Sequence, residues 1–423
     1  MGKKKKGPKL PKKIKWEQDA DIHQRKFVNV YEVQCAKVSS IPCPWLMAIM
    51  KKAIEERFYV RKFIIEAEDD NDTGEPPAPQ IRLDPVINAI RKSHFIYVYE
   101  LAAWNFELEH QTVANLALLI EKGIYPITGI ELMDCSLLYY SVERLARSFR
   151  FSSLTEVNLD YNEFGDEGCV KLCGGCKNNK TIVSLSLCYC ALTYRSGLPL
   201  GEVAFHSTIR EFFLDGNRLE CQGVMDMTRA IAVAAEDDNA RRIEEERLKA
   251  LMMAEGALQA TDKNMTSQMG TEASGASGGD GAEKSDGAEK PKKKKKKKGK
   301  KKKKEPDPPV VGPFIYKLHL ADNGIDGWCD GRDDLLFACV GVIARLIMYS
   351  HCLCELDIDD NAIGNLSAQE LLAALERRKE GNLPGLKMKT TTEIQKDTFS
   401  AIVKLASGLK KKKKKGKKKK KKK

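Results

Sequence analysis

Apolar residues return along this chain in one fixed order. The order is apolar, two residues, apolar, one residue, apolar, two residues, Asn or Cys, one residue, apolar. Six stretches follow it: ITGIELMDCSL (127–137), LTEVNLDYNEF (154–164), IVSLSLCYCAL (182–192), IREFFLDGNRL (209–219), IYKLHLADNGI (315–325) and LCELDIDDNAI (353–363). The alternation of apolar and other residues in the middle of each stretch is typical of a strand with one buried face.

Amphipathic segments separate these stretches and predict helices. EGCVKLCGGCKNN (167–179) and GRDDLLFACVGVIARLIMYS (331–350) are the clearest, and Gly165 and Gly168 mark the turn into the first of them. Each unit is therefore predicted to run strand, turn, helix. One such unit cannot bury its own apolar positions, so neighbouring units must stack into a continuous core.

The repeat length and the polar position identify a family. The third apolar position recurs at Leu132, Leu159, Leu187 and Leu214. These steps are 27, 28 and 27 residues long. The polar position is occupied, in chain order, by Cys135, Asn162, Cys190, Asn217, Asn323 and Asn361. The alternation of Cys and Asn resembles the ribonuclease-inhibitor-like class of leucine-rich repeat proteins.

This resemblance implies an α/β solenoid, shaped as a horseshoe, with parallel strands on the concave face and helices on the convex face. The six Cys and Asn residues are predicted to be structural. Their side chains point inward where the chain leaves each strand, and there they can bond backbone groups that have no ladder partner.

Weaker copies of the pattern extend the array in both directions. IYVYELAAWNF (96–106), VRKFIIEAE (60–68) and VNVYEVQCA (28–36) are predicted as further strands, and LKM (386–388) as the start of a last one before a helix. We predict five segments: a disordered basic tail over 1–24, repeats over 25–235, a helical and then disordered Lys-rich insert over 236–311, repeats over 312–408, and a disordered poly-Lys tail over 409–423.

Charge divides the chain into an acidic body and basic appendages. The runs in 1–15, 292–304 and 410–423 hold 33 of the 72 Lys and Arg residues, which leaves 39 against 59 Asp and Glu. Runs of like charge cannot collapse, so these three are predicted to be disordered. The insert lies between the strands around Leu214 and Leu320, and it is expected to leave the stacking intact and to visit the acidic strand face.

The thirteen cysteines do not indicate disulfides or a metal centre. The N-terminal residues lack the apolar region of a secretory signal, so we expect reduced thiols. Cys169, Cys173 and Cys176 have a spacing that could hold zinc, but no fourth ligand lies nearby and a buried helix core is the simpler interpretation. Arg345 argues against a membrane span in the most apolar window. We assign no catalytic, cofactor-binding or metal-binding residue.

The candidate binding residues lie on the predicted strand face. They are Glu131, Asp134, Asp160, Tyr161, Tyr189, Phe213, Asp215, His319, Asp322, Asp357, Asp359 and Asp360. Charge is common on any solvated face, but this set has one sign with aromatic residues interleaved. It therefore predicts a docking surface for a protein partner with a basic surface.

These features favour a non-catalytic, monomeric scaffold in the cytoplasm. Its lysine runs are expected to meet a polyanion, for which acidic tubulin tails, nucleic acid and anionic membrane all stay open. Analogy with similar repeat proteins points to a ciliary, axonemal or microtubule-associated role. The alternatives are a GTPase regulator similar to the activator of Ran, and a nuclear or nucleolar protein associated with nucleic acid.

Overall fold

The computed structural model describes residues 12–67, 80–121, 123–177, 179–268, 310–327 and 333–408. Its contacts divide the chain into two compact units, Met1–Asn239 with Pro309–Lys423, and Ala240–Pro308. The lysine runs of 292–304 and 409–423, and the first eleven residues, lie outside the described residues. The disorder predicted for them is therefore not addressed.

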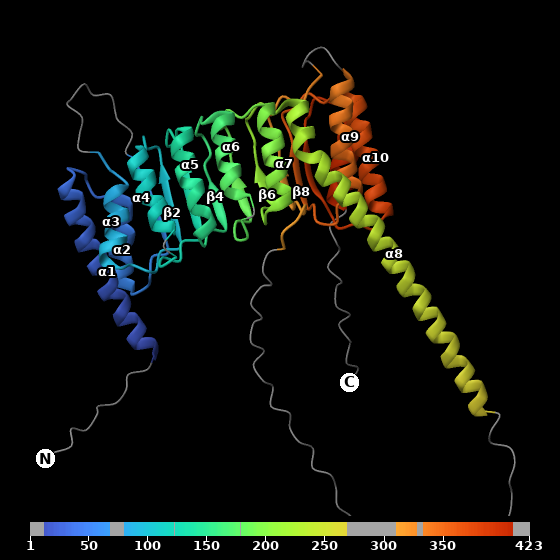
Figure 1. Cartoon of the computed structure of the whole chain (residues 1–423), viewed down its shortest axis with the longest axis horizontal. Coiled ribbons are helices and arrows are strands. Elements are labelled where there is room, and N and C mark those ends of the chain that lie inside the picture. Colours follow the sequence, from blue (N-terminus) through green and yellow to red (C-terminus); the bar gives the residue numbers. More distant parts are fainter. Residues whose placement is uncertain are drawn as a thin grey trace, which may run out of the picture. The chain divides into compact units, whose positions relative to one another are not determined.

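The first unit is built on one sheet of parallel strands in chain order (Figure 1). The described strands are β1 Lys62–Glu66, β2 Glu100–Trp104, β3 Gly129–Met133, β4 Glu156–Asn158, β5 Ser184–Ser186, β6 Glu211–Phe213, β7 Lys317–His319, β8 Glu355–Ile358 and β9 Lys387–Thr390. Each pairs in parallel with the next strand in the chain. The predicted leucine-rich-repeat solenoid is thereby confirmed.

Helices connect the strands, and those of the first unit, with α8 counted to Asn239, cover one face of the sheet (Figure 1). They are α1 Lys12–Lys37, α2 Pro44–Glu56, α3 Asp84–Ser93, α4 His110–Glu121, α5 Tyr139–Ser148, α6 Gly165–Cys176, α7 Gly197–His206, α8 Glu220–Gln268, α9 Asp333–Tyr349, α10 Gly364–Glu380 and α11 Lys396–Gly408. No described helix combines the length and the apolar character needed to cross a membrane.

The register places one buried residue of each strand in a single line. That line is Phe63, Leu101, Ile130, Val157, Leu185, Phe212, Leu318, Leu356 and Met388. The flanking residues of each strand point to the other face, because successive side chains of a strand alternate. The core therefore runs under the whole sheet, and the face away from the helices, here called the strand face, is left open.

The N-terminal predictions were wrong in two places. Residues 28–36, predicted as a strand, belong to α1, and this helix begins at Lys12, inside the segment 1–24 that was predicted to be disordered. Ala20, Gln24, Phe27 and Tyr31 are fully buried at helical spacing. Phe27 packs on Phe63 with ring centroids 5.0 Å apart, so α1 covers the core where the sheet starts.

The insert leaves the sheet unbroken, as predicted. Although the insert separates β6 from β7 in the chain, Phe212 pairs in register with Leu318. Arg210 holds the returning chain: it donates to the carbonyl of Val310 at 2.7 Å and to the hydroxyl of Tyr316 at 2.7 Å. Its guanidinium also lies 4.8 Å from the centre of the Tyr316 ring.

A buried arginine joins neighbouring repeats near the C-terminal end of the array, although its charged neighbours in the sequence do not indicate burial. Arg378 is fully buried in α10, within the charged stretch LERRKEG. It donates to the carbonyls of Ile347 at 2.7 Å, Ser350 at 2.8 Å, Leu353 at 2.9 Å and Pro384 at 3.0 Å. Burial lowers the pKa of Arg378 to about 10, so the group stays charged at neutral pH.

We predict that Arg378→Met lowers the free energy of unfolding by about 3 kcal/mol, because three buried carbonyls and the more exposed carbonyl of Pro384 lose their donor. The measurement is urea denaturation of the full chain. Lys379→Met is the matched control, since Lys379 is exposed on the same helix, and its effect should stay within about 0.5 kcal/mol. Equal unfolding midpoints for the two variants would contradict this role.

Candidate interaction surface on the strand face

A ladder of buried Asn and Cys side chains forms the base of the surface. Asn162 accepts from the backbone N–H groups of Cys135 at 3.0 Å and Leu137 at 3.1 Å, and it donates to the carbonyl of Leu132 at 2.7 Å. The Cys135 thiol donates to the carbonyl of Ala103 at 3.3 Å. Burial raises the pKa of this thiol to about 12, so it keeps its proton.

The same contacts recur along the sheet. Asn217 accepts from Cys190 and Leu192, and Asn361 accepts from Asn323 and Ile325, at 3.0 to 3.1 Å. All six residues at this position are buried: Cys135, Asn162, Cys190, Asn217, Asn323 and Asn361. They lie inside the fold, where they hold neighbouring turns together.

The residue before each of these six has a left-handed backbone. The positions are Asp134, Tyr161, Tyr189, Gly216, Asp322 and Asp360, with φ between 50° and 69°. Non-glycine residues rarely adopt this conformation, and Asp is one of those that tolerate it. The five side chains of this set, here called the edge row, are exposed at the carboxyl ends of the strands. The edge row contains five of the predicted docking residues.

Two further rows cross the strands themselves. The first is Lys62, Glu100, Gly129, Glu156, Ser184, Glu211, Lys317, Glu355 and Lys387, and the second is Ile64, Ala102, Glu131, Asn158, Ser186, Phe213, His319, Asp357 and Lys389. Sequence reasoning missed the four lysines. Those in the first row occupy a strand position that it did not consider, and Lys389 belongs to the incomplete last repeat.

These lysines make the face less uniformly acidic than predicted. At one end Lys62 lies 2.6 Å from Glu131 and 3.5 Å from Glu100. At the other end, three more pairs form: Lys317 with Glu211 at 2.9 Å, Lys387 with Glu355 at 2.5 Å, and Lys389 with Asp357 at 2.5 Å. Three lysines therefore neutralise three carboxylates at the C-terminal end of the strand face, whereas at the other end Lys62 is shared by two glutamates.

Two predicted contact residues, Asp160 and Asp357, are buried instead of exposed. The Oδ1 atom of Asp160 accepts from the Ser186 hydroxyl and the Cys188 N–H, both at 2.7 Å. Burial raises the pKa of Asp160 despite these bonds. The side chains of both residues contact neighbouring repeats and so stabilise the fold. They leave little surface for a partner.

Two others take part in internal contacts. The ring of His319 lies between Asp215 at 3.7 Å and Glu355 at 3.4 Å, and its edge meets the ring of Phe213 with centroids 4.7 Å apart. Asp215 also accepts from the backbone N–H of Ala321 at 2.8 Å. His319 therefore belongs to the neutralised end of the face.

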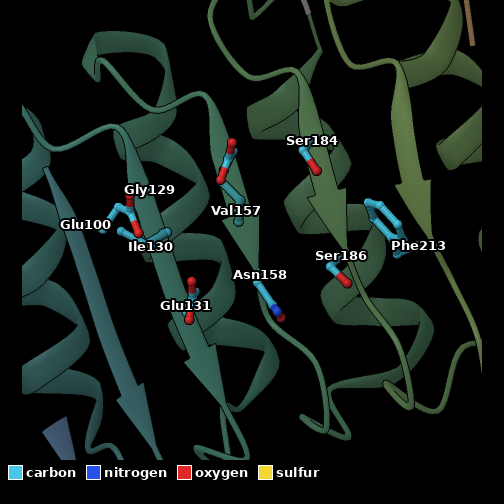
Figure 2. A pocket seen from close by; sticks show the side chains of 10 residues that line it. Glu100, Gly129, Ile130, Glu131, Val157, Asn158, Ser184, Ser186 and Phe213 are labelled. Atoms are coloured by element: carbon cyan, nitrogen blue, oxygen red, sulfur yellow. The ribbon is translucent and has the colours of Figure 1, made fainter. Parts of the chain in front are cut away.

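The centre of the face is hollow. A depression of about 290 Å³ lies across β2 to β6. It is lined by Glu100, Gly129, Ile130, Glu131, Glu156, Val157, Asn158, Ser184, Ser186 and Phe213. Figure 2 shows Glu131, Asn158, Ser186 and Phe213 side by side on successive strands. The hollow exists because glycine and serine fill positions where neighbouring strands carry long side chains.

The charge of this hollow is negative: of its three carboxylates, Glu100 and Glu131 share Lys62, and Glu156 is open. The outward-facing residues of β3 to β6 include no Lys or Arg. Glu131 is paired with Lys62, whereas Glu156 is exposed and forms no ion pair with any described residue. A cationic group from outside would therefore meet an open carboxylate here, with the ring of Phe213 at the other side.

The cysteine cluster of α6 is packed within the core. The sulfur atoms of Cys169 and Cys173 lie 3.9 Å apart, and burial raises the pKa of Cys176 to about 12. Within the described ranges, no group of three or more His, Cys, Asp or Glu side chains is arranged to hold a metal ion. These thiols contribute apolar volume between neighbouring helices.

Comparison with known proteins agrees with the architecture. A family model described as Leucine Rich repeat matches residues 152–173, which contain β4 and most of α6. A search of curated proteins gives no match. Together with the parallel sheet, the family match supports assigning the chain as a leucine-rich repeat protein. The narrower ribonuclease-inhibitor-like class stays a prediction.

We predict opposite stability effects for two hydrogen-bonded aspartates, the buried Asp160 and the partly buried Asp166. The pKa of Asp160 is raised by burial, so its ionisation costs stability as pH rises. Asp160→Asn keeps the accepting oxygen and removes the charge, and we expect a higher free energy of unfolding at pH 7.5. The difference should shrink as the pH falls, when the wild-type carboxyl is protonated. Denaturant titrations at pH 7.5 and pH 4.5 measure it.

Asp166 is the matched comparison. Burial raises its pKa, but bonds from Ser196 and Thr193 outweigh this and leave the pKa lowered. Its contribution is present at neutral pH and lost on acidification. Asp166→Asn should therefore be less stable than wild type at pH 7.5, with the deficit shrinking toward low pH. A shift of both variants in the same direction would refute the assignment.

Proposed function

We propose that the chain is a non-catalytic scaffold whose strand face binds a basic segment of a protein partner. The supporting observation is the division of charge on that face. The lysines at both ends are paired internally, while the hollow over β3 to β6 keeps Glu156 open and has Phe213 at its other side. A surface of one sign steers and selects a partner of the other sign, and a buried aromatic contact anchors it.

The lysine-rich segments suggest a second attachment. The run in 292–304 contains twelve lysines and neither arginine nor an aromatic residue. Such a run attracts polyanions in a salt-dependent way but reads no base. We propose that these segments tether the scaffold to a polyanion in the cytoplasm. Acidic tubulin tails are our first choice, in a ciliary or other microtubule-associated role, ahead of nucleic acid and anionic membrane.

Charge reversal at the hollow tests the first part. The probe is a fluorescein-labelled peptide of alternating arginine and glycine, titrated into the full chain at physiological salt. We expect Glu156→Lys to weaken binding about tenfold, because an open carboxylate becomes a repelling ammonium. Glu167→Lys makes the same change of net charge on the exposed side of α6 and should leave the affinity within about twofold of wild type. Equal loss in both variants would mean that only net charge matters.

Co-sedimentation tests the tether. The full chain should pellet with microtubules at low salt, and removal of the tubulin tails by protease should abolish pelleting, since the acidic charge resides in those tails. A chain that ends at residue 408 should pellet less than the full chain. Pelleting that does not respond to tail removal would exclude tubulin tails as the polyanion, and a parallel DNA-binding titration then measures the nucleic-acid alternative.

A further inference from the structure

Two exposed tyrosines of the edge row form a flat stack. The rings of Tyr161 and Tyr189 lie 4.9 Å apart with an angle of 5° between their planes. They come from the same position in successive repeats, and 50% of Tyr161 and 43% of Tyr189 is exposed. Packing within the fold does not require this arrangement, since both rings stand outside the core.

Gly216 fixes one side of the stack. It occupies the same position in the next repeat, and a Cβ atom there would lie 2.2 Å from Cε1 of Tyr189. The ring of Tyr189 therefore lies directly against the backbone of Gly216, and Tyr161 covers its other side. Within the described part of the chain, Tyr161 contacts no other aromatic ring and no cationic side chain. The open aromatic surface of the stack belongs to Tyr161.

Carboxylates flank the stack on both sides. Asp134 holds the equivalent position before Tyr161, and its N–H bonds to the carbonyl of Asp160 at 3.0 Å. Asp322 and Asp360 follow Gly216 in the same row. All three aspartates are exposed, and no Lys or Arg occupies the row. An exposed ring beside carboxylates attracts a cation through both its π-face and the neighbouring charge.

Arginine fits this arrangement better than lysine does. A guanidinium is planar, stacks on aromatic faces and can give two parallel hydrogen bonds to a carboxylate, whereas an ammonium is a strongly hydrated point charge. The flanking carboxylates would repel the phosphates of a nucleic acid that stacked its bases here. We propose that Tyr161 and Tyr189 form a platform that selects arginine side chains of the partner, with Asp134 accepting from the guanidinium.

The platform lies within reach of a segment bound in the hollow. Asn158 and Ser186 line the hollow, and each stands three residues before one of the tyrosines. Three residues span at most about 10 Å, which an extended segment and one arginine side chain can bridge. The inference rests on the proposed function, because it names the side chain that the bound basic segment presents at the edge of the sheet.

Paired peptides test the platform. The probes are two fluorescein-labelled peptides of equal length, one alternating arginine with glycine and one alternating lysine with glycine, titrated into the full chain. We expect wild type to bind the arginine peptide about fivefold more tightly. Tyr161→Leu should remove this preference and leave the affinity for the lysine peptide within about twofold. Gly216→Ala, which displaces the ring of Tyr189, should also reduce the preference.

Tyr139→Leu is the matched control, because Tyr139 is an equally exposed tyrosine on α5 and its loss should not change the preference. Equal affinity of wild type for the two peptides would overturn the platform, as would an unchanged preference in Tyr161→Leu. Binding of a labelled oligouridylate that depends on Tyr161 would also overturn it, in favour of base stacking. The Glu156→Lys variant separates the two proposals. If the hollow binds the peptides, this variant should have a lower affinity for both of them, whether or not Tyr161 contributes to the arginine preference.

Discussion

The structure depends on one constraint that recurs in every repeat. The backbone N–H and carbonyl groups of the turn after each strand need hydrogen-bond partners. In the interior of the array, a single side chain per repeat meets this need by bonding to the turn of the previous repeat. Because the amide of Asn or the thiol of Cys must point inward, the residue before it turns outward with a left-handed backbone. The ladder that holds the fold together therefore also decides which residues are displayed at the edge of the sheet.

Charge on the strand face is arranged by the same register. Residues that pair across the sheet are aligned within a few ångströms, so a lysine on one strand meets a glutamate on the next. This neutralises the C-terminal end and leaves a small, acidic hollow where the repeats carry Gly129, Ser184 and Ser186. The hollow results from the small residues of the middle repeats, which leave room beside the open carboxylate of Glu156.

The sequence predicts the repeats well and the details of the surface less well. The spacing of Asn162 and Asn217 is enough to place β4 and β6. The backbone groups of the turn after each strand need a side chain of this type at this position. The burial of Asp160 and the position of Arg378 were not predictable in this way. Both depend on contacts with other repeats. From the sequence alone, a charged residue in a polar stretch is predicted to be exposed. The repeat pattern predicts a strand over 28–36 where α1 runs, because the apolar residues there fit both spacings.

The junction between β6 and β7 has a consequence for the integrity of the molecule. The two strands are joined by backbone pairing in register, by the bond of Asn323 to the carbonyl of Leu214, and by Arg210 at the point of return. All of these contacts are made by residues outside the insert. The sheet thus consists of two halves, one on each side of the insert in the sequence, which pair through β6 and β7. We expect a chain cut within the insert to remain one assembly of two polypeptides.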